Sequence, residues 1–389
     1  MKKRLLAILL ATTLVSTLLA GCGKTEPKGD TPSTTSAPVA EGNTINIGVV
    51  ASLTGGSAVY GEGAKNAVTM AAEEINSSDS KYKVKIVDVV DDGGDSKQAV
   101  NAYNSLEPKK PNAVVGAFFS SVTLPMAEIA KGQNMLLLAA GATNKKVTEV
   151  GPTIFRDCFI DPYQGKMAAA FAKDQGATKA AIIYAKDDDY SNGLKDAFVE
   201  NAKSNGIEVV YTGECTTKDT DFTAQASKAV QSGADFVFYP CFLDTVPLFV
   251  QQIREAGYKG VIMGGDGWDG SNTSGLESYF DKCYFTNHYS SEDTAPAVQK
   301  FVTKYKEKYG EDTLNACAAL YYDAIYMLVA AAEKGGSVNT ADLVKGMTGL
   351  TFTGVGGTFT IDENRNAVKS VVINTYEGGK VKWLKTLNP

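Results

Sequence analysis

The sequence predicts an α/β protein built from two doubly wound parallel sheets, each forming one lobe. Three observations indicate this fold class. Short β-branched runs alternate with segments of helical periodicity, the alternation begins again after about residue 160, and glycines and polar residues follow most predicted strands. With 389 residues, the chain is long enough for two ordinary domains.

The first series of elements begins with the β-branched run INIGVVA, which is typical of a buried strand. Apolar residues between Ala64 and Ile75 then recur at helical spacing, which predicts a helix with one buried face. The predicted strands are 45–51, 83–90, 112–118 and 134–140, and the predicted helices are 64–75, 95–106 and 123–132.

The second series repeats this order and therefore predicts a second lobe. Its predicted helices are 163–175, 191–204, 221–232 and 245–256, and its predicted strands are 179–185, 207–212, 235–240, 260–265 and 283–289. Two long helices, 294–309 and 314–334, and strands near 351–360 and 369–385 follow. These late elements belong to one lobe or the other.

The N-terminus has the pattern of an export signal. Basic residues from Lys2 to Arg4 precede an apolar run that is short for a membrane-spanning helix, so residues 1–21 are expected to be a signal peptide. Leu19, Ala20, Gly21 and Cys22 resemble the lipobox of bacterial lipoproteins, which implies that Cys22 is acylated. An ordinary signal peptide with an incidental cysteine and an uncleaved anchor helix remain alternatives. Residues 22–44, rich in Gly, Ser, Thr and Pro, predict a flexible linker behind the anchor.

Composition narrows the possible functions of the remaining chain. The net charge of −6 and the absence of a basic stripe argue against nucleic acid as a partner. A single histidine, His288, argues against a histidine-based zinc site, and we expect neither metal nor cofactor. We expect the five later cysteines to be small buried hydrophobes, although one disulfide is possible. No later segment is expected to span a membrane, because we expect none to approach the required length.

Polar residues at the predicted strand ends of the first lobe suggest a binding site for a carboxylate. Ser120 follows one strand, beside a helix that we expect Ser121 or Thr123 to cap, and free N–H groups at a helix start favour a negative group. Gly141 and Thr143 follow the next strand and offer backbone access and a hydroxyl. These residues are equally consistent with capping and turn formation. A further glycine-rich turn precedes a helix, with Tyr60 expected just before that helix.

The strand ends of the second lobe offer an acid and aromatic rings. Asp266 follows two glycines, where it could accept hydrogen bonds from an ammonium group or simply form a turn. Tyr190, Phe242 and Trp268 could line an apolar pocket, or they could be core residues. The acidic runs 91–95 and 187–189 lack the spacing of an EF-hand and are expected to form turns and helix caps.

Five motifs occur in the order found in a known family. They are IGVVASLTGGSAVYGEGAKNAVTMAAEEIN, DDGGDSKQAVNA, VVGAFFSSVTLPMAEIA, AAGATNKKVT and IFRDCFIDPYQG. Together they resemble the branched-chain amino acid binding proteins of ABC importers, which have the type I periplasmic-binding-protein fold. The resemblance implies two lobes joined by three hinge crossovers. It places residues 45–159 and 290–360 in the N-terminal lobe, and 160–289 and 361–389 in the C-terminal lobe.

The resemblance also implies a ligand site between the lobes. Its expected residues are Tyr60, Phe119, Ser120, Gly141, Ala142, Thr143, Tyr190, Phe242 and Asp266. Ser120 and the loop from Gly141 to Thr143 would hold the carboxylate of an amino acid, and Asp266 with a loop carbonyl would hold its ammonium group. The chain departs from the familiar pattern, since Asp266 stands where Glu is common, Phe242 lacks a hydroxyl, and Phe118 and Phe119 are bulky. The expected ligand is therefore an amino acid, and these departures do not single out leucine, isoleucine or valine.

The resemblance implies a monomeric, lipid-anchored, extracytoplasmic receptor that delivers an amino acid, branched-chain or otherwise apolar, to an ABC permease and its ATPase subunits. The alternatives are a sensor for a membrane signalling partner, or a binding protein for another small carboxylate or amide. An enzyme is not expected, because the chain has no GxSxG motif and no recognisable base for a catalytic triad.

Overall fold

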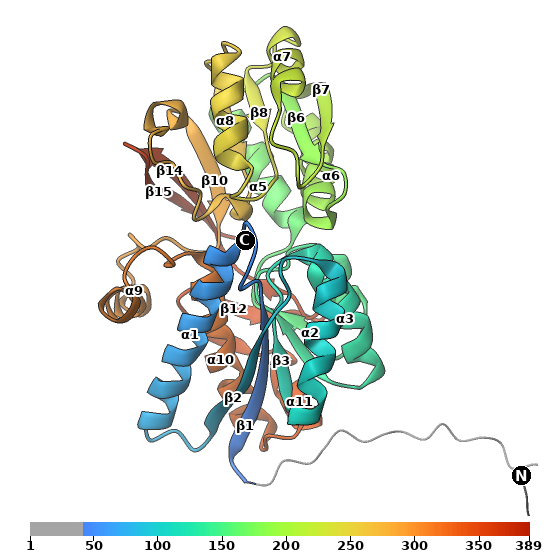
Figure 1. The fold of residues 1–389 in the computed structure, drawn as a ribbon, viewed down its shortest axis with the longest axis vertical. Helices are drawn as coiled ribbons and strands as arrows, with labels where there is room; N and C mark the ends of the chain where they lie inside the picture. Colours follow the sequence, from blue (N-terminus) through green and yellow to red (C-terminus); the bar gives the residue numbers. More distant parts are fainter. Residues whose placement is uncertain (1–41) are drawn as a thin grey trace, which may run out of the picture. The chain divides into compact units, whose positions relative to one another are not determined.

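The computed structural model describes residues 42–389, which form two α/β lobes, each built around a sheet of parallel strands (Figure 1). The fold class predicted from the sequence is therefore confirmed. The expected signal peptide, Cys22 and nearly all of the expected linker lie outside the described residues.

The first lobe contains a sheet of five parallel strands in the order β2-β1-β3-β4-β5. Its strands are β1 (Thr44–Ala51), β2 (Lys83–Asp91), β3 (Ala113–Val115), β4 (Leu136–Ala139) and β5 (Ile154–Arg156). Strands β3, β4 and β5 are buried along their whole length, as expected for a parallel sheet covered on both faces. Their carboxyl ends meet at one edge of the sheet.

Helices cover this sheet from both sides, with α1 and α10 on one side and α2 and α3 on the other (Figure 1). The helices of this lobe are α1 (Ala58–Ser77), α2 (Ser96–Leu106), α3 (Ser120–Gly132), α4 (Lys146–Glu149), α9 (Pro296–Tyr309), α10 (Ala316–Gly335) and α11 (Thr340–Met347). Within residues 42–389, α10 alone is long and apolar enough to cross a membrane. The expectation that no segment after the N-terminal signal reaches that length was therefore wrong. In the structure 83% of its apolar window is buried, as in the core helix of a globular lobe.

The second lobe contains a seven-stranded sheet in the order β15-β14-β10-β9-β8-β6-β7. Five strands run parallel, and β14 and β15 add to one edge in antiparallel pairing. The strands are β6 (Lys179–Ala185), β7 (Glu208–Cys215), β8 (Phe236–Phe238), β9 (Val261–Gly264), β10 (Cys283–Asn287), β14 (Val371–Glu377) and β15 (Lys380–Leu387). The helices are α5 (Asp161–Asp174), α6 (Asp189–Ser204), α7 (Thr223–Gln231) and α8 (Val246–Glu255).

The chain changes sheet three times, after β5, after β10 and after a small antiparallel sheet. That small sheet consists of β11 (Thr351–Gly354), β12 (Gly357–Ile361) and β13 (Ala367–Val368). The expected lobe boundary between residues 360 and 361 falls inside β12. The pairing of β12 with β13 instead places the change of sheet after Val368.

Two local expectations about helix starts were wrong. Helix α3 begins at Ser120, its N-cap residue is Phe119, and the Thr123 hydroxyl donates to backbone carbonyls of residues 117 and 119 instead of capping the helix. Helix α1 begins at Ala58, so Tyr60 lies in its first turn and not before it. In both places the apolar pattern identifies the buried face of the helix but not the residue at which the helix begins.

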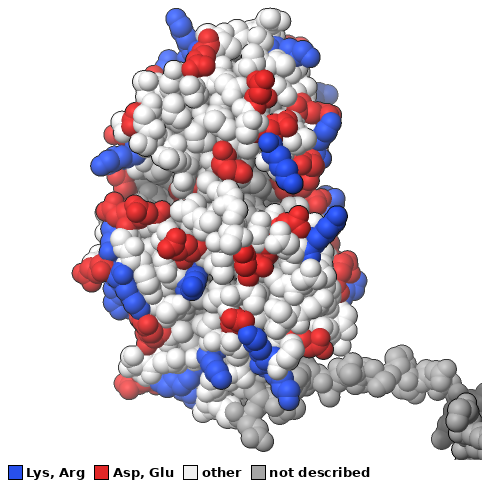
Figure 2. Space-filling model, viewed as in Figure 1, with Lys and Arg blue, Asp and Glu red and all other residues white. Residues whose placement is uncertain are grey.

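The described cysteines are all free and buried, which confirms the expectation that they act as small hydrophobes. On the face of the molecule displayed in Figure 2, basic and acidic side chains are intermixed, without one large region of a single sign.

Candidate functional site

Residues from both lobes line a cleft with a volume of about 440 Å³. The first lobe contributes the turns around Thr54 and Gly94 and the start of α3, and the second lobe contributes the turns around Asp188, Thr217 and Phe242. Every one of these turns follows a strand of a parallel sheet, which is where open α/β sheets bind ligands.

Most of the expected ligand-site residues lie beneath this cleft and not on its wall. Phe119 and Phe242 line the cleft, whereas Tyr60, Ser120, Thr143, Tyr190 and Asp266 are at most 2% exposed. The remaining two, at positions 141 and 142, are also buried. The expected site is thus enclosed by the contact between the lobes.

The loop from Gly141 to Thr143 is held in place by a buried guanidinium group. Arg156, at the end of β5, donates to the carbonyl of Ala142 at 2.7 Å and to that of Asn144 at 2.8 Å. Gly141 has a φ of +114°, and a Cβ there would lie 2.4 Å from the Phe118 ring, so only glycine fits. The Thr143 hydroxyl is buried and makes no hydrogen bond of good geometry in the described chain, although it acts on the nearby Asp161 carboxyl.

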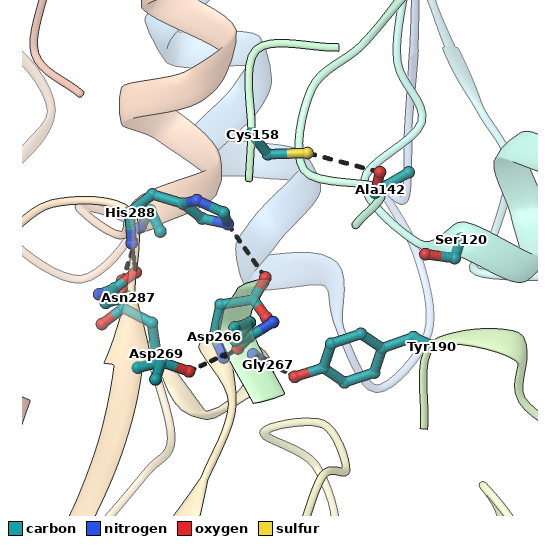
Figure 3. Close-up of polar contacts among 12 residues, drawn as sticks. Ser120, Ala142, Cys158, Tyr190, Asp266, Gly267, Asp269, Asn287 and His288 are labelled. Atoms are coloured by element: carbon teal, nitrogen blue, oxygen red, sulfur yellow. Dashed lines mark hydrogen bonds and ion pairs between the residues drawn. The ribbon is translucent and has the colours of Figure 1, made fainter. Parts of the chain in front are cut away.

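Ser120 has a hydroxyl that can donate outward. Its Oγ accepts the backbone N–H of Asn144 at 3.1 Å, which ties the start of α3 to the neighbouring loop. A serine hydroxyl that accepts one bond keeps its proton for another acceptor. Figure 3 shows this hydroxyl directed toward the side on which Tyr190 and Asp266 lie.

Asp266 brings a buried carboxyl to the same region from the second lobe. It follows β9, and its backbone N–H donates to Gln164 Oε1 at 2.9 Å. Its Oδ2 lies 3.1 Å from His288 Nε2, while its Oδ1 has no partner within residues 42–389 (Figure 3). A buried acceptor without a partner is costly, so this oxygen is suited to a ligand donor.

Two tyrosines complete the contact between the lobes. The Tyr60 hydroxyl lies 2.9 Å from the carbonyl of Gly267 and 2.8 Å from that of Asp269, and the Tyr190 hydroxyl accepts the Gly267 N–H at 3.2 Å. Burial, with a smaller contribution from nearby aspartates, raises the pKa of both tyrosines well above the usual 10. Both hydroxyls therefore stay protonated at physiological pH.

Aromatic rings pack together within each lobe beside these polar groups, and the pair formed by Phe119 and Phe242 joins the two lobes. The ring centroids of Tyr60 and Phe118 are 4.6 Å apart, those of Phe119 and Phe242 are 4.6 Å apart, and those of Tyr190 and Phe242 are 4.7 Å apart. Trp268 does not join them, since it packs in the core of the second lobe and its Nε1 donates to the Tyr239 carbonyl.

The structure adds four buried polar residues that the sequence analysis did not select, namely Arg156, Asp161, Gln164 and His288. Asp161 stands in the first turn of α5, and burial raises the pKa of its carboxyl well above 3.8, against a smaller lowering by the Thr143 hydroxyl. Three of the four belong to the motif IFRDCFIDPYQG, but only the tertiary contacts identify a role for them.

The acidic runs form turns and helix caps, as expected. Asp91 accepts the N–H groups of Leu53 and Gly93, and Asp95 and Asp188 cap α2 and α6. The described residues contain no group of three or more His, Cys, Asp or Glu side chains that could hold a metal ion.

Comparison with known proteins identifies the family. The family model described as "Periplasmic binding protein" matches residues 44–380. The Leu/Ile/Val-binding protein BraC3 of Rhizobium johnstonii is 31% identical over 318 residues, which cover 79% of this chain and 84% of that protein. The leucine-, isoleucine-, valine-, threonine- and alanine-binding protein of Pseudomonas aeruginosa is 25% identical, with coverage of 87% and 91%.

Solved structures agree with this assignment. The leucine-binding protein LivK of Thermotoga maritima superposes with a TM-score of 0.83 and 31% identity, covering 89% of this chain and 99% of that one. The LivJ substrate-binding protein of Streptococcus pneumoniae, in complex with isoleucine, superposes with a TM-score of 0.82 and 25% identity, covering 89% and 100%. The chain therefore belongs to the periplasmic binding protein family, among the extracytoplasmic substrate-binding proteins of ABC transporters.

Proposed function

We propose that this protein captures a free amino acid between its lobes and delivers it to an ABC importer. One observation carries the proposal. Thr143 Oγ1 in the first lobe and Asp266 Oδ1 in the second are both buried, and neither makes a hydrogen bond of good geometry within residues 42–389, although the Thr143 hydroxyl acts on the Asp161 carboxyl and Asp266 acts on the Tyr190 hydroxyl. A hydroxyl can donate to a carboxylate and a carboxylate can accept from an ammonium group, so the two groups match the two ends of an amino acid.

The surrounding charges support this orientation of the ligand. The guanidinium of Arg156 lies behind the loop that carries Thr143, which favours a negative group on that side. Ser120 adds a second donor there. On the other side Asp266 and the nearby backbone carbonyls favour a positive group. The curated relatives named above bind leucine, isoleucine or valine, and we extend amino acid binding, but not yet one side chain, to this protein.

Calorimetry with the full chain in detergent tests the proposal. L-leucine, its amide and 3-methylbutylamine, which is leucine without its carboxylate, form the decisive series. Removing one charged end leaves buried partners unpaired, so each analogue should bind about 100-fold more weakly or worse. Equal affinities for the three compounds would refute the zwitterion site. If leucine itself does not bind, L-isoleucine, L-valine, L-alanine and L-threonine with their amides repeat the test.

We further propose that Cys22 anchors the protein to the membrane through acyl chains, as its lipobox-like context suggests. The anchor would keep the receptor near its permease. Radiolabelled palmitate should be incorporated into the wild type but not into Cys22→Ala, which should be released into the medium or accumulate as precursor. Equal labelling of wild type and Cys22→Ala would contradict the lipid anchor. That outcome would not bear on the proposed amino acid binding.

A further inference from the structure

Asp266 lies within hydrogen-bond distance of the chain's single histidine, His288, where the chain crosses between the lobes for the second time. His288 immediately follows β10, at the start of the segment that leads to α9 in the first lobe. Its side chain is fully buried, and its Nε2 lies 3.1 Å from Asp266 Oδ2. Figure 3 shows the imidazole ring above the carboxyl group, on the side away from Tyr190.

The imidazole is held rigidly in this position. Its ring stacks on Phe159, from the first passage between the lobes, with a centroid separation of 3.9 Å and an interplanar angle of 29°. Stacking fixes the plane of the ring, and the backbone N–H of His288 donates to Asn287 Oδ1. Ring nitrogen Nδ1 has no partner in the described chain.

The hydrogen bond determines which tautomer is present. A carboxylate only accepts, so with Asp266 as a carboxylate the contact assigns the ring proton to Nε2. Burial lowers the pKa of His288 below 6.5, against a smaller opposing effect of Asp266, so the ring is neutral at physiological pH. A neutral donor satisfies Oδ2 without cancelling the negative charge of Asp266, and Oδ1 stays available for a cation.

We propose that His288 is a positioning residue that orients Asp266 so that Oδ1 receives the ammonium group of the ligand. This inference rests on the proposed function. A second bond from the Asp266 N–H to Gln164 fixes the backbone of the acid, while His288 lies within hydrogen-bond distance of its carboxyl Oδ2 and the carboxyl also acts on the Tyr190 hydroxyl. Without His288, Oδ2 would lose its partner and the buried carboxyl would take up a proton or rotate, for instance toward the Tyr190 hydroxyl, so that Oδ1 would no longer face the ligand.

A comparison of ligands with and without an amino group can tell whether His288 positions Asp266 or only supports the fold. We compare L-leucine with 4-methylpentanoate, which is leucine without its amino group, by calorimetry on wild type, His288→Phe and His288→Gln. Phe keeps the stacking on Phe159 but removes the donor, whereas Gln retains an N–H group near the place of Nε2. His288→Phe should weaken leucine binding about 10-fold to 100-fold, since a hydrogen bond to a charged group is lost. Binding of 4-methylpentanoate should change less than about twofold, and His288→Gln should recover most of the leucine affinity.

The outcomes distinguish the two proposals. If leucine does not bind, the amino acid that does bind and its analogue without the amino group replace this pair. If wild type binds that amino acid no better than the analogue without the amino group, the proposed function fails and this inference fails with it. If wild type does prefer leucine but His288→Phe loses both ligands equally, or loses neither, the positioning role alone is overturned. Because the chain has one histidine, long-range ¹H–¹⁵N spectra report His288 directly. They should show the Nε2–H tautomer in the wild type and a changed tautomer balance in Asp266→Asn, and an Nδ1–H tautomer in the wild type would overturn the pairing.

Discussion

Tyr60→Phe is expected to weaken ligand binding without unfolding either lobe. The Tyr60 hydroxyl, on the first lobe, reaches the carbonyls of Gly267 and Asp269 on the second lobe at 2.9 and 2.8 Å. If the lobes separate to admit the ligand, water can replace these contacts on both sides. The hydroxyl therefore stabilises the form in which the lobes are in contact, relative to the open form.

The expected size follows from the burial of the three groups. Loss of a neutral hydrogen bond that leaves buried acceptors unpaired costs about 1–3 kcal/mol. If the ligand binds tightly only when the lobes close, its Kd should rise by about 5-fold to 150-fold. Because the Tyr60 pKa lies well above 10, the hydroxyl stays protonated and the effect should be constant between pH 6 and 9.

Calorimetry with L-leucine measures this effect, and Tyr321→Phe is the matched control. The Tyr321 hydroxyl is also buried, but it donates at 2.7 Å to the carbonyl of Val50 within the first lobe. This control should lower the melting temperature by about 2–4 °C for each kcal/mol lost and leave the Kd unchanged. A Kd within about twofold of wild type for Tyr60→Phe, or an equal rise in Tyr321→Phe, would refute the reasoning.

Three further changes test the rest of the site and its surroundings. Thr143→Val removes a buried hydroxyl that makes no well-formed hydrogen bond in the described chain and affects Asp161 less than burial does, so the melting temperature of the ligand-free protein should hardly change while the Kd for leucine rises about tenfold or more. Gly141→Ala forces a Cβ against Phe118 at a φ of +114° and should cost about 2–4 kcal/mol of stability, whereas Gly233→Ala, at a φ of +72° with open space, should cost about 1–2. Burial raises the pKa of Asp188 from 3.8 to about 6, so this acid favours folding below pH 3.8 and loses that contribution as the pH rises through 6. Thermal melts of Asp188→Asn should therefore gain on wild type between pH 4 and 7, by up to about 3 kcal/mol, and parallel pH profiles would contradict this assignment.

Local sequence patterns determine the order of strands and helices in this protein. Runs that contain β-branched residues, such as 45–51 and 179–185, form strands as their local pattern predicts, because their side chains suit a buried parallel sheet. The same patterns place Ser120, Thr143 and Asp266 after strands, and parallel strands bring their carboxyl ends to one edge. Short elements such as β5, α4 and α11 carry too little periodicity to be recognised.

Contacts between distant segments are decided only by the tertiary structure. No local pattern joins His288 to Asp266, Arg156 to the carbonyl of Ala142, or Tyr60 to Gly267, which is 207 residues away. The geometry of both sheets and of the three passages between them determines which buried polar groups meet. The sequence thus determined which chemical groups stand at the strand ends. Packing decided which of those groups satisfy one another, and which are left for a ligand, because hydrogen bonds require atoms to meet within about 3 Å.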